Sequence, residues 1–234
     1  MRRNWFPPAA ARLRYGPPPT LTYTDYRERG SDRTVYTNLA CDLGAQQDRR
    51  YIVIAVHWDD NTSQDNPLLS VTVGGVPATI IGELGSPASS GDRYDPAVAL
   101  CFVEYDNANT TADIEMTFTY QCARMAMGVW QMHNGHEIEL IDFDTEYLQV
   151  THAGSSSITL DTIEGGVVVY AQTLRDPATT SGYSPLTRRY DDSVDTGKLG
   201  AEGLDVSGTP SGATTYGYST IPQENTTGIA ASFR

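Results

Sequence analysis

The segment YIVIAVHW at residues 51–58, with AVALCFVEY at 97–105 and CARMAMGVWQMH at 122–133, decides the fold of this chain of 234 residues. These runs are short, rich in β-branched and aromatic residues, and bounded by turn residues, a pattern typical of strands. Similar runs lie at residues 21–26, 34–43, 68–73, 78–84, 113–120, 137–143, 156–161, 166–173 and 226–233. We find no stretch with a convincing helical period. The sequence therefore predicts an all-β protein.

Turn residues separate many of these runs. Gly74-Gly75, Asn134-Gly135 and Gly165-Gly166 indicate tight turns, because glycine and asparagine tolerate a positive φ. At Asn134-Gly135 we expect a hairpin. Many short strands with turns at intervals of about ten residues are typical of a sandwich or closed barrel. We predict a single antiparallel β-sandwich of jelly-roll or immunoglobulin-like type over residues 21–234, preceded by an extended arm.

The arm comprises residues 1–20 and differs in composition from the rest of the chain. It holds five prolines and lacks acidic residues, and its basic and aromatic side chains are Arg2, Arg3, Trp5, Phe6, Arg12, Arg14 and Tyr15. Proline favours an extended backbone, aromatic rings supply area to bury, and arginine forks onto carboxylates or carbonyls. We expect this arm to dock on a partner protein.

Residues 174–225 are dominated by Gly, Ser, Thr, Asp, Pro and Tyr and contain few apolar runs. We predict a long excursion from the sandwich there. Within it, Tyr183, Tyr190, Tyr216 and Tyr218 are candidate recognition residues, since a tyrosine ring gives contact area at a low entropic cost. The alternative is that these rings pack the segment onto the sandwich.

The net charge of −13 is unevenly distributed. Residues 1–50 carry nine Arg against five acidic residues, so the remaining 184 residues carry −17. An acidic body of this kind repels nucleic acid and anionic membranes, and no apolar run approaches the roughly 20 residues that span a bilayer. We expect neither nucleic-acid binding nor membrane insertion. The odd cysteines Cys41, Cys101 and Cys122 predict buried, reduced thiols in a chain made in a reducing cytosol.

Candidate chemistry is sparse. His133 and His136, with Glu137 beside them, could share a cation, and the acidic segments 59–66 and 142–146 offer oxygen ligands for Ca²⁺. The histidines lack a third placed ligand, and the segment 59–66 lacks the glycine and glutamate of an EF-hand. No nucleophile elbow, P-loop or dinucleotide motif is present. We expect no enzyme activity, cofactor or metal.

The central part of the chain resembles a β-sandwich module that recurs among uncharacterised proteins of tailed phages and prophages. The matching features are Arg50 before a central strand, the hairpin Ser70–Thr79 and the Gly128–Trp130 run, and the resemblance covers residues 43–175. It carries no catalytic motif. It implies a virion component of a tail, head fibre or capsid decoration.

These observations predict a surface structural protein of a bacteriophage virion, made in the host bacterial cytoplasm and docked to other virion proteins through its arm. We expect a homo-oligomer, a trimer or a higher symmetric assembly, that contacts host-surface glycan. The principal alternative is a carbohydrate-binding module without catalytic activity, which uses a sheet face or the segment 174–225. A third alternative is a hydrolase whose site the sequence does not reveal.

Overall fold

The computed structural model describes residues 16–60, 66–85, 96–148, 154–175, 180–194, 199–220 and 225–234. Within these ranges every regular element is a β-strand and every strand pairing is antiparallel, so the all-β prediction is confirmed. The strands are β1 (Thr20–Arg29), β2 (Arg33–Asp42), β3 (Tyr51–Asp60), β4 (Leu68–Val73), β5 (Val76–Pro77), β6 (Thr79–Gly85), β7 (Pro96–Glu104), β8 (Thr111–His133), β9 (Leu140–Leu148), β10 (Gly154–Thr162), β11 (Val167–Arg175), β12 (Thr180–Ser184), β13 (Thr187–Val194), β14 (Leu199–Ser207), β15 (Gly212–Thr220) and β16 (Thr226–Phe233).

Strand β8 organises the largest sheet, which we call sheet A. The two runs expected at 113–120 and 122–133 form one strand of 23 residues. Its C-terminal half pairs with β1 and β3, and its N-terminal half pairs with β2 and β4. Sheet A therefore has two parts. The long leaf contains β1, β3, β6, β7 and the C-terminal half of β8, and the short leaf contains β2, β4, β5 and the N-terminal half of β8.

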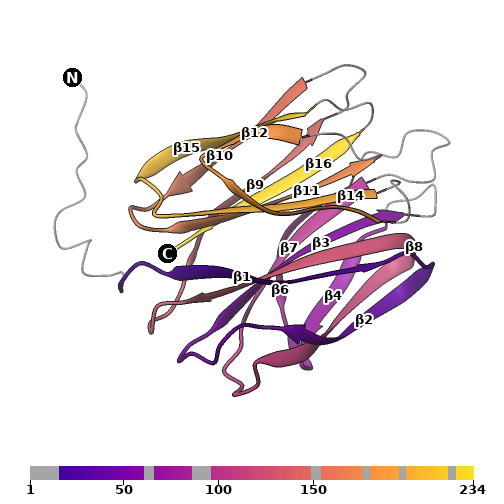
Figure 1. Ribbon diagram of the computed structural model, residues 1–234, viewed down its shortest axis with the longest axis horizontal. Helices are drawn as coiled ribbons and strands as arrows, with labels where there is room; N and C mark the ends of the chain where they lie inside the picture. The colour runs from indigo at the N-terminus through magenta and orange to yellow at the C-terminus, as the bar shows by residue number, and fades with distance from the viewer. Residues whose placement is uncertain are drawn as a thin grey trace.

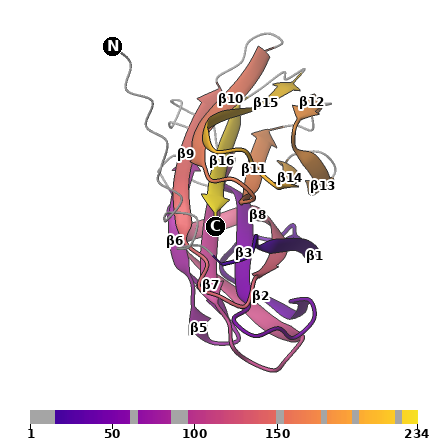
Figure 2. The same cartoon turned by 90° about the vertical axis from the view of Figure 1, so that its left-hand side faces the viewer.

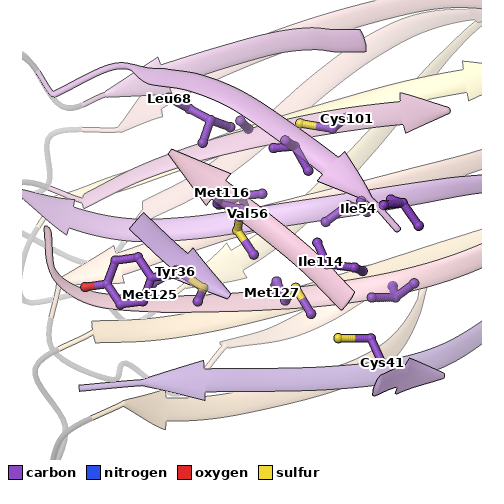
Figure 3. Close-up of a cluster of buried hydrophobic side chains, with 14 of the residues drawn as sticks. Tyr36, Cys41, Ile54, Val56, Leu68, Cys101, Ile114, Met116, Met125 and Met127 are labelled. Carbon is purple, nitrogen blue, oxygen red and sulfur yellow. The ribbon is translucent and has the colours of Figure 1, made fainter. Parts of the chain in front are cut away.

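The first hydrophobic core lies between the two leaves. Alternate residues of β3, including Ile54 and Val56, face the core beside Met125 and Met127 of β8. The buried side chains of the short leaf, such as Met116, pack against them (Figure 3). Full burial of one large apolar side chain contributes about 2 kcal/mol, so this cluster is a main source of stability.

Two further sheets stack on the long leaf. Sheet B has the order β13-β14-β11-β16-β9, and sheet C has the order β10-β15-β12. A second core joins the other face of the long leaf to sheet B, and a third core joins sheet B to sheet C. Figures 1 and 2 show this succession of layers. Strands β11 and β16 are buried on both faces, as is most of β3 and β7, which explains why acidic and arginine residues occur only at the ends of these strands or not at all.

The single sandwich is not confirmed, because three cores separate four stacked layers. The segment 174–225 also differs from the expected excursion: it contains strands β12 to β15, of which β14 lies inside sheet B and β15 inside sheet C. Glycine and alanine in the sequence LGAEGLDVS of β14 weaken its apolar signal, yet these small residues let it pack closely. A Cβ on Gly203 would lie only 2.1 Å from Cε1 of Tyr190.

Of the two hairpins that the turn residues predict, one is present and one is not. Gly74 and Gly75 have φ values of 56° and 81° and join β4 to β5 as a hairpin, as predicted. Gly135 has a φ of 74°, but the expected hairpin at Asn134-Gly135 is wrong, because β8 belongs to sheet A and β9 to sheet B. Across the described ranges, no helix is long and apolar enough to span a bilayer.

Candidate functional site

A buried arginine shapes one end of sheet A. The Arg50 side chain is fully buried, and its Nη2 donates hydrogen bonds to the carbonyl oxygens of Asn107 (2.8 Å) and Asn109 (2.7 Å). Its Nη1 donates to the Gly44 carbonyl, and its guanidinium carbon lies 5.3 Å from the centre of the Tyr105 ring. Burial lowers the pKa of Arg50. The guanidinium group thus binds carbonyl oxygens and the face of a tyrosine ring instead of a carboxylate. These contacts of Arg50 hold the β7–β8 loop in place.

This loop forms one wall of a polar groove on the short leaf. The groove has a volume of about 510 Å³. Its lining residues are Thr37, Thr72, Gly74, Gly75, Tyr105, Asn107, Asn109, Thr111, Ala112, Asp113 and Glu115. Thr37 Oγ1 donates to Glu115 Oε2 (3.2 Å), and the Ala40 amide donates to Asp113 Oδ1 (2.9 Å). No basic residue lines the groove, so it suits ligands that donate hydrogen bonds.

The outer face of the short leaf carries exposed apolar side chains around the groove. Alternation along β2 buries Tyr36 in the first core and turns the opposite face outward. Val35, Leu39, Leu69 and Val76 are 40%, 65%, 58% and 41% exposed. Among the described elements none packs on this face. We treat these side chains as a candidate surface for protein association.

A second, smaller depression lies at the edge of the long leaf. Its volume is about 280 Å³, and its lining residues are Tyr51, Pro77, Thr79, Phe102, Val103, Glu104, Glu137 and Ile138. The Tyr51 and Phe102 rings stack with centroids 5.2 Å apart and an interplanar angle of 5°. Tyr51 and Glu104 are register partners on β3 and β7. This aromatic–carboxylate pocket therefore has two exposed carboxylates, those of Glu104 and Glu137, whereas Tyr51 is only 3% exposed and its ring is stacked on Phe102.

A buried polar chain crosses the second core. His57 Nδ1 lies 2.9 Å from Thr173 Oγ1, and His57 Nε2 lies 2.7 Å from the Tyr190 hydroxyl. Thr173 Oγ1 donates its proton to the Ala97 carbonyl (2.9 Å), so Nδ1 must donate to Thr173 and Nε2 accepts from Tyr190. Burial lowers the pKa of His57 to about 3, which keeps the imidazole neutral. The chain is a satisfied structural link between the long leaf and sheet B.

The predicted recognition tyrosines require a correction. The Tyr190 side chain lies in the second core against Trp130, 5.8 Å between ring centroids, and Tyr216 lies fully buried in the third core. Neither ring is available to an external ligand in this structure. The backbone of Tyr183 belongs to β12 and that of Tyr218 to β15, and their side chains lie outside the described part.

A charged network next to Tyr190 had no clear signal in the sequence. Asp205 accepts a hydrogen bond from the Trp130 indole (2.8 Å) and a bidentate pair from Arg189 (2.7 and 2.8 Å). At the end of β3, the buried Asp59 carboxylate pairs with Arg124. Burial raises the pKa of Asp59 to about 6 despite that partner. These pairs are distant in sequence, so only their burial in the fold reveals them.

The remaining predicted sites have simple outcomes. The arm residues Arg2, Arg3, Trp5, Phe6, Arg12, Arg14 and Tyr15 lie outside the described residues, as do residues 61–65 of the first acidic segment. The segment 142–146 is part of strand β9, where the Asp142 carboxylate accepts the backbone amides of Phe143 and Asp161. In the part of the chain that the structure describes, no three His, Cys, Asp or Glu side chains gather as a metal site. Cys41, Cys101 and Cys122 are buried and are not joined by a disulfide.

A scan against protein-family models finds no match to this chain, and a search of the curated proteins finds none either.

Proposed function

We propose that the protein is a non-enzymatic structural component of a bacteriophage virion, exposed on the particle surface as part of a tail, fibre or capsid decoration. The N-terminal arm anchors it to other virion proteins, and its body contacts the host surface. Support comes from the resemblance of residues 43–175 and from the basic, proline-rich arm on an acidic body. Opposite charges on arm and body favour ordered packing between neighbouring subunits.

The observation that carries this proposal is the uncovered face of the short leaf. Leu39 and Leu69 leave more than half of their surface in water, which is unfavourable unless another surface covers them. We infer that a second copy of the chain covers this face in a homo-oligomer, a trimer or a higher symmetric assembly. The outer side of β2, β8 and β4 is then the surface that packs between identical copies.

We also infer that the sandwich of the resemblance corresponds to the long leaf and sheet B. The second core joins these two layers through alternate residues of β3, β7 and β8, and Gly128–Trp130 of the matching pattern lies in β8. The matching hairpin Ser70–Thr79 lies mainly in β4 and β5 of the short leaf, so the resemblance includes this leaf as well.

Sedimentation of the purified protein tests the oligomer. We expect the wild type to sediment as a trimer or larger, and a Leu39→Glu/Leu69→Glu variant to sediment as a monomer. Leu140→Glu is the matched control, because Leu140 is 39% exposed but belongs to β9, away from the short leaf. A wild type that stays monomeric at about 100 μM would contradict self-association, since stable interfaces bind more tightly than this.

The polar groove supports the second candidate, a carbohydrate-binding module. Its threonine, asparagine and carboxylate lining can accept and donate hydrogen bonds to sugar hydroxyls. Tyr105 is only 2% exposed, so the groove offers little ring face for stacking. Calorimetric titration with a panel of bacterial surface glycans tests this candidate. Saturable binding that is lost in Asp113→Asn/Glu115→Gln favours it over a purely structural role.

A further inference from the structure

We propose that the polar groove of the short leaf takes a neutral or amino-bearing saccharide, and that the hydroxyl of Tyr105 binds one hydroxyl group of that ligand. This inference rests on the proposed function, because it names the ligand class through which the body of the protein contacts the host surface. The groove volume of about 510 Å³ lies within the usual range of small-ligand sites.

The Tyr105 hydroxyl is a polar group without a protein partner at the wall of the groove. The Tyr105 side chain is only 2% exposed and lines the groove. Across the residues that the structure describes, no group hydrogen-bonds this hydroxyl, and protein atoms do not fully enclose it. A Cβ on Gly74 would lie 2.5 Å from the hydroxyl oxygen, so glycine at this turn leaves the hydroxyl open. It can both donate to and accept from a ligand hydroxyl.

The groove wall is held in place from behind by Arg50. The Tyr105 amide donates to the Arg50 carbonyl (2.7 Å), and the Arg50 guanidinium carbon lies 5.3 Å from the centre of the Tyr105 ring. The same guanidinium binds the carbonyls of Asn107 and Asn109, which also line the groove. The tyrosine and the loop are therefore fixed before a ligand arrives, which lowers the cost of binding.

The floor of the groove presents hydroxyls and carboxylates in a row. Glu115 of β8 is the register partner of Thr37 on β2 and of Thr72 on β4, and paired residues direct their side chains to the same face. Asp113 lies two residues away on β8, about 6.8 Å along the strand. Asp113 Oδ1 and Glu115 Oε2 each accept one hydrogen bond, and within the described ranges the second oxygen of each carboxylate accepts none. Such acceptors match the closely spaced hydroxyl groups of a sugar ring.

Charge decides which saccharides fit. The groove is lined by two carboxylates and by no basic residue, on a body that is itself strongly acidic. An acidic sugar or a phosphate group is repelled by such a surface. A protonated amino group can instead donate charge-assisted hydrogen bonds to the carboxylates. The ligand class is therefore neutral or amino-bearing saccharide, and acidic saccharides are excluded.

Calorimetric titration of the full-length protein with three disaccharides tests the ligand class. The probes are N,N′-diacetylchitobiose, which is neutral, chitobiose, which carries two amino groups, and digalacturonic acid, which carries two carboxylates. We expect saturable binding of the first two probes. Digalacturonic acid should bind at least about tenfold more weakly, because like charges at one site are unfavourable. Equal affinity for all three probes would overturn the inference.

The variant Tyr105→Phe isolates the hydroxyl. It removes an oxygen that has no partner within the described part of the protein and keeps the ring that Arg50 contacts, so its thermal midpoint should equal that of the wild type. We expect its affinity for N,N′-diacetylchitobiose to fall about three- to tenfold, the effect of one lost hydrogen bond. Tyr120→Phe is the matched control, because Tyr120 is 39% exposed and does not line the groove. Unchanged affinity in Tyr105→Phe would contradict the role of this hydroxyl.

The second copy inferred above covers the same face, so the titrations are repeated with Leu39→Glu/Leu69→Glu. Neither leucine lines the groove. Binding by the wild type and by this variant supports a groove that stays open in the oligomer. Binding by the variant alone supports the same ligand class in a groove that lies under the neighbouring copy. Absence of saturable binding in both proteins would overturn the inference.

These results are separable from the proposed function. If no probe binds, yet the wild type sediments as a trimer or larger and needs its arm for incorporation into particles, the structural role stands and only this inference falls. If the probes bind as expected but arm deletion leaves incorporation intact, the groove holds its ligand and the proposed anchoring role falls.

Discussion

His57 Nε2 lies 2.7 Å from the Tyr190 hydroxyl, and this contact joins the long leaf of sheet A to sheet B across a buried core. His57 belongs to β3 and Tyr190 to β13. The neutral imidazole accepts from Tyr190 and donates to Thr173, so each ring nitrogen has one partner. Protonation would place a second N–H donor against the tyrosine and a charge in an apolar core, which is unfavourable.

The first prediction follows from this contact and concerns acid stability. The folded pKa of His57 is about 3, against 6.5 for an ordinary histidine, so between these values the unfolded chain binds one more proton. The free energy of unfolding should fall as pH drops from about 6.5 toward 3, by up to ~1.4 kcal/mol per pH unit from this residue. Denaturant titrations of the wild type and His57→Gln at several pH values measure the difference in slope.

Asp59 serves as an internal comparison because its contribution to the free energy of unfolding changes with pH in the opposite direction. Its folded pKa of about 6 exceeds the ordinary 3.8, so its stabilising contribution is complete below about 3.8 and is lost as pH rises through 6. In His57→Gln this opposing contribution remains while the histidine contribution is gone. Equal slopes in the wild type and His57→Gln between pH 4 and 6 would contradict the assignment of His57 as neutral and buried.

The second prediction concerns the space around the Tyr190 ring. A Cβ on Gly203 would lie 2.1 Å from Cε1 of Tyr190, and one on Gly128 would lie 2.2 Å from the same atom. Gly203→Ala should therefore destabilise the protein by about 3 kcal/mol, because the ring must move within a packed core. Gly85→Ala is the control, since its Cβ would meet only Ala97 Cβ at 3.9 Å. Thermal unfolding compares the two, and similar midpoints would contradict this packing.

The third prediction concerns Arg50. Lysine cannot reproduce the forked contacts with the Asn107, Asn109 and Gly44 carbonyls, so Arg50→Lys should lower the free energy of unfolding by about 2–4 kcal/mol. The exposed neighbour Arg49 provides the control. Arg49→Lys should change the free energy of unfolding by less than about 0.5 kcal/mol. Urea titration measures both. If the two variants lose equal stability, Arg50 does not hold the β7–β8 loop as described.

The fourth prediction concerns the thiols. Cys41, Cys101 and Cys122 are buried, and burial raises the pKa of Cys41 and of Cys101, so few thiolates form in the folded protein. The native protein should react slowly with a thiol reagent at pH 8. After unfolding without reductant, all three cysteines should react, as expected for reduced thiols. A single reactive group in the unfolded chain would indicate a disulfide.

The sequence predicted most strands because they are short runs rich in β-branched and apolar residues, bounded by turn residues. The run 226–233 coincides with β16, which is buried on both faces, and the run 68–73 coincides with β4, which is exposed at Leu69 and Ser70. The sequence could not predict which strands share a sheet, because the sheets depend on pairings between residues far apart in the chain, such as Val35 with Thr117. The strands of 174–225 were missed because Gly200, Ala201 and Gly203 give close packing but almost no apolar signal.

The candidate sites were less predictable than the fold. His57 stands alone in the apolar run YIVIAVHW, and its partners Thr173 and Tyr190 lie more than 100 residues away. Glu104 and Glu137 come together only because β7 ends next to the segment that follows β8. Arg50 was identified through the resemblance, but its carbonyl contacts depend on the conformation of a loop. Side chains that meet across sheets leave no local pattern in the sequence.

The anchoring role of the arm is tested most directly by the copy number of the protein in purified phage particles. The deletion should remove residues 1–15 only, because Pro19 is buried and the Pro17 carbonyl contacts Asn134. Particles assembled with the full-length or the shortened protein are compared by quantitative mass spectrometry, after thermal unfolding has shown that both proteins are folded. We predict that the shortened protein keeps its thermal midpoint but is nearly absent from particles. Incorporation of the shortened protein at full copy number would contradict the account.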